Sequence, residues 1–398
     1  MKTKVLYIFG GEQASGAEIV IEALMAKSID HVEPHLFISP GRFSEKLIAL
    51  QKPYVMTVMP QLRKLNRSKS GKAAFVLKAL RNYFVISSMA LKYVRKHTIT
   101  TVHANTIVPA CYLIPAILFA KVFHPKLKWI WSDHDMVYFK KMDHYFASLC
   151  GKLYDKTLVV SKAVKLKYGN NPKVEILYNG LDTMVYKPDV QARNAFRNQW
   201  NVKEQTILFA IAGIISPRKR QLELMEAFGK IETKGANVLL FLAGDFGPDD
   251  LVYNEKVKAL TAQQPNVHYM GHIDNMVEFY NGCDVIVNNS SDKGSEPFGA
   301  TIYEAMSCQT LVMAADTGGL PELVDHQKNG FLFAPDNMAA LVEMMEYIVQ
   351  NFYNTDVVRK AARDKVIQKF GFDAIVDQYK GILGITNRSA AKVHVVVA

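Results

Sequence analysis

Short apolar runs alternate with longer amphipathic stretches along most of this 398-residue chain. Four to eight apolar residues followed by a helix-length segment are typical of βαβ units, in which crossover helices join buried parallel strands. The first series predicts strands at Val5–Phe9, His35–Ile38, Thr98–His103, Trp129–Ser132, Thr157–Val160 and Val174–Tyr178. The second predicts strands at Ile207–Ala212, Val238–Ala243, Val267–Met270, Val285–Val287, Leu311–Ala314 and Phe331–Phe333. The pattern therefore predicts an α/β protein with two parallel sheets.

Two domains also suit the length, because a single core seldom grows beyond ~250–300 residues. The polar stretch Lys187–Gln205 separates the two series and is predicted to be a linker. We expect one domain at residues 1–185, a second at 204–370, and a last segment at 371–398 that begins with a helix. The longest apolar segment, Ile107–Ala120, contains two prolines and is too short to cross a bilayer, so we interpret it as a buried helix.

Composition indicates a globular protein of the cytosol. Apolar residues make up 49% of the chain, which is enough for substantial cores. The four cysteines form no C-x-x-C pair and lie in apolar runs, where reduced, buried thiols are expected. The first apolar run is too short for a secretory signal, so we expect no export signal and a cytoplasmic location.

Positive charge is concentrated between residues 41 and 100. This segment holds thirteen Lys and Arg residues against one acidic residue, Glu45, whereas the whole chain has a net charge of +11. Leucine and aromatic residues are interleaved with the charges, as in a helix at an anionic membrane surface, where each basic residue contributes ~1 kcal/mol. We therefore expect peripheral binding to the inner face of the cell membrane, although a solvated helix face or a helix packed on a core fits the same spacing. A nucleic-acid partner is not expected, because it would leave the motifs described next unexplained.

The segment Gly294–Met306 joins two glutamates to a helix-opening glycine. We predict that Gly299 precedes a helix that begins at Ala300 and carries Glu304 in its second turn. The first N–H groups of such a helix favour an anion such as a diphosphate. Glu296 is suited to accept hydrogen bonds from sugar hydroxyls, and Glu304 to accept both hydroxyls of a ribose. The segment thus indicates a nucleotide-sugar site, whereas in isolation it would equally fit a solvated loop.

A second loop supports this interpretation. The turn Gly318–Gly319 follows the strand Leu311–Ala314, just as the Glu296 loop follows the strand Val285–Val287. Loops at the carboxyl ends of parallel strands lie at one edge of a sheet and bind ligands there. We therefore expect both loops to face one ligand.

With these motifs the chain resembles the retaining glycosyltransferases of the GT-B fold, in particular the glycogen-synthase-like glycosyltransferase family 4. The resemblance rests on residues at family-like spacings: Gly213, Lys219, Gly244, Gly271, Asp284, Glu296, Phe298, Gly299, Glu304, Ala305, Gly318, Gly319, Glu322, Asn329 and Gly330. It implies two Rossmann-like domains facing across a cleft, with the acceptor on the first and the nucleotide-sugar donor on the second. It also implies that the helix at Phe372–Leu383, in the last segment 371–398, crosses back to the first domain. It also implies donor contacts from Gly213, Gly244, Phe298, Gly299 and Ala300, and neither a cofactor nor a metal ion.

The chain departs from the family pattern at the expected phosphate contacts. The family usually has an arginine and then Lys-Gly after the first strand of the second domain. Here Lys219 holds the place of the lysine, but Ile214 replaces the arginine and Arg220 the glycine. Ser216 followed by a proline favours a helix start, so we predict that Arg218 or Arg220 supplies the missing charge from a first helical turn.

Two further candidates lie in the first series. His134 directly follows the predicted strand Trp129–Ser132 and resembles the family's active-site histidine, which typically contacts the donor sugar. Gly16 lies in a glycine-containing loop after the first strand, where backbone amides suit a phosphate, and Ser15 and Glu18 are spaced as a capping box. The order of glycines lacks the dinucleotide fingerprint, so no nicotinamide cofactor is expected.

The sequence therefore predicts a retaining, metal-independent glycosyltransferase with His134, Lys219 and Glu296 in catalytic roles. We expect a lipid-linked or phosphate-bearing glycan acceptor, as in surface polysaccharide or glycolipid biosynthesis. The alternatives are a transferase for a soluble small acceptor, a phosphorylase, and a catalytically silent scaffold that binds nucleotide sugars. The silent scaffold is suggested by Ile214.

Overall fold

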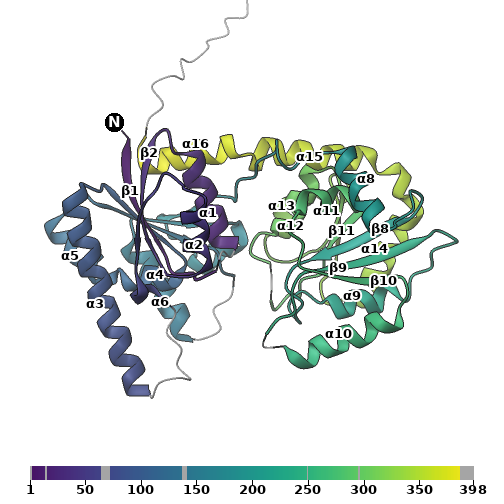
Figure 1. The fold of residues 1–398 in the computed structure, drawn as a ribbon, viewed down its shortest axis with the longest axis horizontal. Helices are drawn as coiled ribbons and strands as arrows, with labels where there is room; N and C mark the ends of the chain where they lie inside the picture. Colours follow the sequence, from purple (N-terminus) through teal and green to yellow (C-terminus); the bar gives the residue numbers. More distant parts are fainter. Residues whose placement is uncertain are drawn as a thin grey trace, which may run out of the picture. The chain divides into compact units, whose positions relative to one another are not determined.

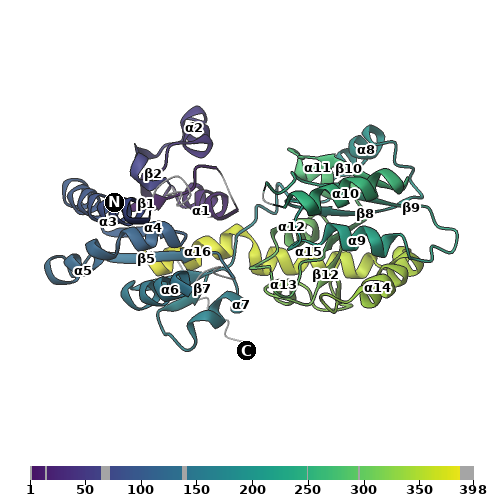
Figure 2. The same cartoon turned by 90° about the horizontal axis from the view of Figure 1, so that it is seen from below.

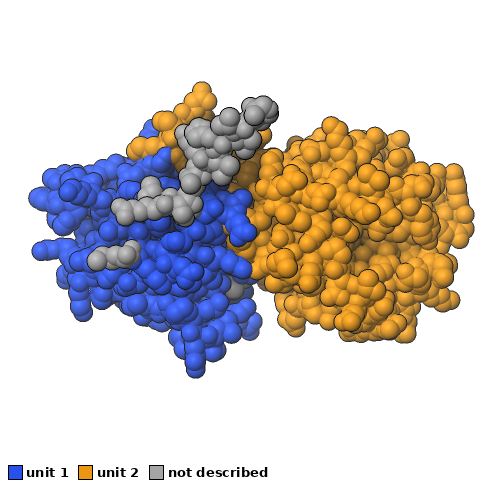
Figure 3. Space-filling model, turned by 90° about the horizontal axis from the view of Figure 1, so that it is seen from above, with its two compact units in different colours: residues 1–132, 146–158, 373–398 blue, residues 133–145, 159–372 orange. Residues whose placement is uncertain are grey.

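The computed structural model describes residues 2–13, 16–63, 72–136, 141–248, 250–294 and 296–385. Ser15 and the basic residues Lys64, Arg67 and Lys69 lie outside these ranges. Contacts divide the chain into two compact units, shown in different colours in Figure 3. The first unit comprises residues 1–132, 146–158 and 373–398, and the second comprises residues 133–145 and 159–372. The predicted domain boundaries at residues 185, 204 and 370 stay predictions.

The first series of apolar runs forms a seven-stranded sheet with the order β3-β2-β1-β4-β5-β6-β7, in which β1 pairs in parallel with β2 and β4. Its strands are β1 (Thr3–Phe9), β2 (Val32–Ile38), β3 (Val55–Val58), β4 (Thr101–Asn105), β5 (Lys128–Asp133), β6 (Lys156–Val159) and β7 (Val174–Ile176). The accompanying helices are α1 (Gly16–Lys27), α2 (Arg42–Ala49), α3 (Lys72–His97), α4 (Ile107–Tyr112), α5 (Ile114–Phe123), α6 (Lys141–Leu153) and α7 (Lys162–Lys165), with short 3-10 turns at Pro60–Leu62 and Leu166–Tyr168.

The second series forms a six-stranded parallel sheet with the order β10-β9-β8-β11-β12-β13. Its strands are β8 (Ile207–Ala212), β9 (Val238–Ala243), β10 (Val267–Gly271), β11 (Val285–Asn288), β12 (Leu311–Ala315) and β13 (Phe331–Phe333). Its helices are α8 (Val190–Gln199), α9 (Gln221–Phe228), α10 (Leu251–Gln263), α11 (Met276–Gly282), α12 (Ala300–Ser307), α13 (Leu320–Leu323), α14 (Met338–Asn351) and α15 (Asp356–Phe370), with a 3-10 turn at Phe352–Asn354. This is the doubly wound order of a Rossmann-like sheet, and the α/β fold with two such sheets is confirmed.

Strand β8 is apolar at every position because the second sheet is covered on both faces. Leu208 and Ala210 belong to one buried cluster, together with side chains of α8, α11, α12 and α15. Phe209 and Ile211 alternate with them and belong to the opposite cluster, with side chains of α9, α10 and α14. Figure 1 shows α8, α11 and α12 on one side of the strands and α9 and α10 on the other. Burial of both faces gives the continuous apolar runs that the sequence shows.

The C-terminal helix α16 (Phe372–Leu383) packs on the first sheet, and its residues from Asp373 onward belong to the first unit. Its Tyr379 hydroxyl lies 2.9 Å from that of Tyr7 on β1 and 2.8 Å from Nδ1 of His103 on β4. The Nε2 atom of His103 lies 2.8 Å from the Ser132 hydroxyl on β5. All four side chains are buried. This chain of hydrogen bonds satisfies their polar groups and fixes α16 across three strands.

Two elements of the first unit differ from the sequence predictions. Ile107–Ala120 is not one buried helix: a separate helix, α5, begins at Ile114 with Pro115 in its first turn, and its Leu118 and Phe119 are exposed. Strand β3 was not predicted, since it lies at the sheet edge and its ends are exposed. By contrast, all four cysteines are buried free thiols, as predicted. No helix in the described ranges combines the length and the apolar character that a bilayer crossing requires.

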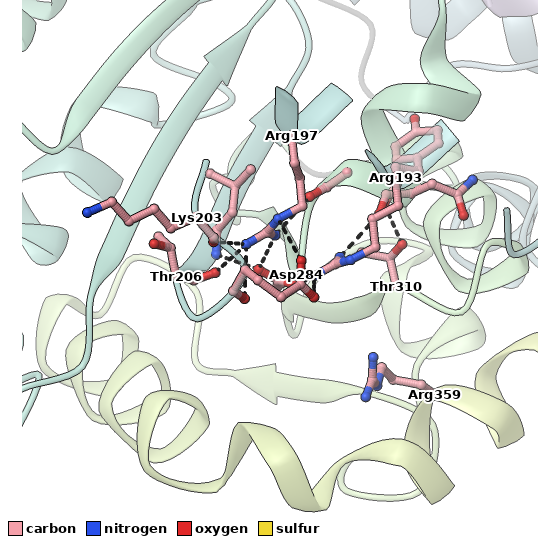
Figure 4. A network of polar contacts seen from close by, with 12 residues as sticks. Arg193, Arg197, Lys203, Thr206, Asp284, Thr310 and Arg359 are labelled. Carbon is pink, nitrogen blue, oxygen red and sulfur yellow. Dashed lines mark hydrogen bonds and ion pairs between the residues drawn. The ribbon is translucent and has the colours of Figure 1, made fainter. Parts of the chain in front are cut away.

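The stretch predicted to be a linker instead contains helix α8, which is bound tightly to the second sheet. Phe196 is buried in the core, and Arg197 places Nη1 3.0 Å from Oδ2 of Asp284, next to the start of β11 (Figure 4). Arg193 places Nη2 3.0 Å from the other carboxylate oxygen. Arg197 also donates to the carbonyl of Thr206, at 2.8 Å. The buried Asp284 carboxylate is fully hydrogen-bonded and holds α8 in place. This contact lies at the amino-terminal end of the strands, opposite to the loops that follow their carboxyl ends.

Candidate functional site

The predicted loops meet at the topological switch point of the second sheet. Strands β8 and β11 are neighbours, and the chain leaves them toward opposite sides of the sheet order. Gly213 follows β8, and the loop that carries Glu296 follows β11. Open α/β sheets bind ligands at this position, because diverging loops leave a crevice beyond the carboxyl ends of the strands.

An ion pair between Lys219 and Glu296 lies at the centre of this region. Lys219 Nζ is hydrogen-bonded to Glu296 Oε2, and the two side chains are only 11% and 12% exposed. Arg218 Nη1 lies 3.6 Å from the same oxygen, and the Ser290 hydroxyl lies 3.4 Å from it. Two cations thus face one carboxylate, which leaves local positive charge for an anionic ligand.

Glu296 is ionised at neutral pH in this environment. Burial alone would raise the pKa of its carboxyl, but the charges of Lys219 and Arg218, with hydrogen bonds from Lys219 and Asn288, lower the pKa below its ordinary value. An ionised carboxylate is a pure acceptor. Glu296 is therefore suited to receive hydrogen bonds from hydroxyl groups.

Glycines let the surrounding backbone approach closely. Gly318 has a φ of +58°, and a Cβ there would lie 2.2 Å from the Glu296 carbonyl oxygen. The N–H of Gly319 donates to that same oxygen at 2.8 Å. The two predicted loops are thus in direct contact. On the β8 side, a Cβ at Gly244 would lie 2.1 Å from the carbonyl oxygen of Gly213, and the Lys219 side chain passes next to Gly213.

The two candidate arginines have different surroundings. Arg218 is the one beside Glu296, whereas Arg220 Nη1 lies 2.6 Å from Oδ1 of Asp336. The predicted helix start at Ser216 is wrong: residues 216–220 form a turn, and α9 begins at Gln221. Arg220 has a left-handed backbone (φ +56°), which ends that turn. The cations therefore extend from a loop and not from the first turn of a helix.

The second glutamate lies on the helix predicted for it. Helix α12 begins at Ala300 directly after Gly299, as predicted, and Glu304 is in its second turn. The Tyr280 hydroxyl donates to Glu304 Oε2 at 2.7 Å. Burial raises the pKa of Glu304 to about 7, although this hydrogen bond acts in the opposite direction. Phe298 is buried against Tyr178 and other aromatic rings, so its side chain belongs to the core of the second unit.

His134 follows β5, as predicted, and belongs to the second unit. Burial lowers its pKa to about 4, with an opposing contribution from the Asp133 charge, so the imidazole is neutral at physiological pH. Asp133 is itself buried and accepts hydrogen bonds from Lys167 Nζ at 2.7 Å and from the Tyr168 hydroxyl at 2.5 Å. Gly16 is the first residue of α1 and lies in the first unit.

The supporting contacts of several residues escaped the sequence analysis. Tyr280 bonds Glu304, and Asn288 at the end of β11 bonds Glu296. Glu322, which follows the Gly318–Gly319 turn, accepts from the Tyr178 hydroxyl at 2.9 Å and from the Ala163 N–H at 3.2 Å. Only Asn288 had a local signal, because it is a polar residue at the end of an apolar strand. The other contacts join segments far apart in sequence.

Comparisons with known proteins bear on the family and the fold of this chain. Residues 192–365 match the family described as Glycosyl transferases group 1. The chain is 26% identical to N-acetyl-alpha-D-glucosaminyl L-malate synthase of Bacillus anthracis over 213 residues. This matched segment covers 53% of this chain and 54% of that protein. It is 25% identical over 236 residues to lipopolysaccharide 1,2-N-acetylglucosaminetransferase of Salmonella typhimurium, covering 56% and 61% of the two chains. The matches thus span little more than half the length of these relatives.

Among solved structures, HepE of Anabaena in complex with UDP superposes with a TM-score of 0.80 at 21% identity, covering 96% of this chain and 100% of that one. At this identity the likeness concerns the fold. Together, the sheet order, the family match and the structural likeness identify the architecture. The chain has the GT-B fold, and residues 192–365 of its second unit match the family model of the group 1 glycosyl transferases.

Proposed function

We propose that this protein is a retaining glycosyltransferase that takes a sugar from a nucleotide-diphosphate donor. The observation that carries the proposal is the pair formed by Lys219 and Glu296, with Arg218 beside it, at the switch point of the second sheet. The ionised Glu296 would accept hydrogen bonds from the sugar hydroxyls, and Glu304 those of the ribose. The complexes of the similar Anabaena protein with UDP and with UDP-glucose support a donor of this class.

The chemistry would rest on electrostatics. Negative charge accumulates on the departing diphosphate as the glycosidic bond breaks, and groups fixed in advance lower the energy of that transition state. The Lys219 ammonium has three N–H groups. One of them donates to Glu296, which holds the ammonium in place, and the other two would be available for phosphate oxygens. Arg218 and the first amides of α12 would add to this field. We propose that these groups replace the divalent ion that other phosphate sites use.

The acceptor is proposed to be a lipid-linked or phosphate-bearing glycan. The Salmonella relative supports this class, since its name places it in lipopolysaccharide synthesis. The basic segment 41–100 would bring the protein to the anionic inner face of the membrane. A soluble small acceptor would not require such a segment.

A panel of nucleotide sugars tests the donor site. A bound donor stabilises the native state, so the matching one should raise the melting temperature. Lys219→Met should lower kcat by about 10²–10³, in line with the loss of a charge-stabilising donor. Lys258→Met is the matched control, because Lys258 pairs with Glu255 on the surface of α10. Activity that survives EDTA would support metal independence. Donor binding without turnover on any acceptor would favour the silent scaffold, and full activity of the Lys219→Met variant would refute the assignment.

A further inference from the structure

Helices α3 and α5 of the first unit contact each other and expose a row of large apolar side chains. Leu77 and Phe84 on α3 are 70% and 66% exposed, and Val122 and Phe123 on α5 are 71% and 62% exposed. Figures 1 and 2 show the two helices next to each other in this unit. Single exposed apolar residues are ordinary, but a contiguous patch marks an interaction surface.

A groove lies between these two helices. It has a volume of about 660 Å³, and its apolar walls come from Phe84 and Leu91 on α3 and from Phe119 and Phe123 on α5. Lys92 and Arg95 of α3, with His124, line the same groove. Arg95, Phe123 and His124 also line an adjoining cavity of about 440 Å³. The combination of long apolar walls and cationic groups fits an amphiphile with an anionic head.

The charge of this face is unopposed. The sequence contains no Asp or Glu between Lys46 and Ser132. The Lys and Arg side chains between residues 76 and 127 are Lys78, Arg81, Lys92, Arg95, Lys96, Lys121 and Lys126. Within the part of the chain that the structure describes, none of these seven makes an ion pair. An uncompensated positive field beside an apolar patch attracts an acidic lipid surface.

We propose that the α3–α5 face binds an anionic phospholipid of the bilayer surface. The lipid phosphate would contact Lys92 and Arg95, and an acyl chain would lie along Phe84, Phe119 and Phe123. The exposed residues around the groove would enter the interface between headgroups and acyl chains. The lipid site rests on the membrane association proposed above. It narrows the membrane-binding region from the basic segment 41–100 to a defined site that also includes α5.

Vesicle co-sedimentation of the full chain tests this site, with vesicles of phosphatidylcholine alone or mixed with phosphatidylglycerol. The wild type should bind only the mixed vesicles, and salt should weaken the binding. Lys92→Glu combined with Arg95→Glu should reduce the partition coefficient by about 25-fold or more, because each basic residue near an acidic membrane contributes about fivefold. Phe119→Ser combined with Phe123→Ser should reduce it by about tenfold or more through the lost apolar insertion.

Matched controls come from exposed positions of the second unit. Lys230→Glu with Lys256→Glu changes the same charge away from the groove, and Leu251→Ser with Val252→Ser removes apolar groups that are even more exposed than Phe119 and Phe123. Both controls should bind mixed vesicles as the wild type does. Groove variants that bind like the wild type would refute the proposal. Equal binding to both vesicle types would also refute the proposal. Release of the protein from vesicles by glycerol phosphate at constant ionic strength would refute it as well, because it would identify a site for a free phosphate.

The readouts also separate this inference from the proposed function. Groove variants that lose vesicle binding should keep their melting temperature and its increase with nucleotide sugar, because the substituted side chains are exposed. A protein that binds no nucleotide sugar but retains groove-dependent vesicle binding would contradict the proposed donor site alone. A protein that binds a nucleotide sugar but shows no groove-dependent vesicle binding would contradict the lipid site alone.

Discussion

A single added methyl group at Gly318 should separate the loops that build the candidate site. The Gly318 backbone has a φ of +58°, and a Cβ at this position would lie 2.2 Å from the carbonyl oxygen of Glu296. Neither group is a flexible side-chain end, so relief requires the Glu296 loop to move. The hydrogen bond from Gly319 N–H to that oxygen, now 2.8 Å, would then be strained or lost.

The size of the effect follows from two contributions. A residue other than glycine costs about 1–2 kcal/mol in the left-handed region. Overpacking a close contact adds about 1–3 kcal/mol. Gly169 offers a matched control, because it has a φ of +56° and no atom within 4 Å of its would-be Cβ. Gly169→Ala should therefore lose only about 1–2 kcal/mol of unfolding free energy, and Gly318→Ala about 2–5 kcal/mol.

Urea unfolding of both variants measures this difference, and calorimetric titration with a nucleotide sugar measures its consequence for the site. Gly318→Ala should weaken donor binding because Glu296 is displaced, whereas Gly169→Ala should leave binding unchanged. If the two variants lose equal stability, the close approach of the loops is not a property of the folded protein. If Gly318→Ala is less stable but binds the donor normally, the position of Glu296 does not determine affinity.

Three further outcomes are expected. Arg197→Met should cost about 3–5 kcal/mol in urea unfolding, because it removes the buried one of the two arginines that pair with the buried Asp284 carboxylate, and an added Asp284→Asn change should restore part of the loss. The pKa of Glu304 in the folded protein is about 7, above its value in the unfolded chain. The protonated carboxyl therefore stabilises the fold at acidic pH, and this contribution is lost as pH rises through about 7. Melting curves should show this loss in the wild type and not in Glu304→Gln. Tyr379→Phe should lower the unfolding free energy by about 1–3 kcal/mol, since it leaves the buried His103 without one hydrogen-bond partner, and a stability equal to the wild type would contradict that network.

The second sheet was predictable because both of its faces are buried. Strands β8 and β9 have the predicted bounds, since both lie inside the sheet, are apolar at every residue, and are preceded by a polar residue and followed by a glycine. Strand β3 had no such signal, because it is an edge strand with exposed ends. Helix α5 was misread for a related reason. Its sequence is almost entirely apolar, and composition alone does not distinguish a helix inside a core from one that presents apolar residues at the surface.

The candidate site was predictable as far as topology determines it. Parallel strands place their carboxyl-terminal loops at one edge, which was sufficient to bring Lys219, Glu296 and the Gly318 turn together. The partners of individual side chains were not predictable. Arg218 and Arg220 are equivalent in sequence, and the distinction depends on Asp336, more than a hundred residues later. The roles proposed for His134 and Gly16 stay predictions.

The buried contacts of Tyr379 impose an order on how the chain matures. A ribosome releases β1 and β4 long before α16, yet the Tyr379 hydroxyl that meets the Tyr7 hydroxyl and Nδ1 of His103 arrives only with that helix. The first unit therefore emerges without the helix that covers these two side chains, while the second unit is released entirely before residue 373. The unit that is synthesised first is thus the last to be completed. A nascent chain stalled before α16 would expose the uncovered part of its sheet to chaperones.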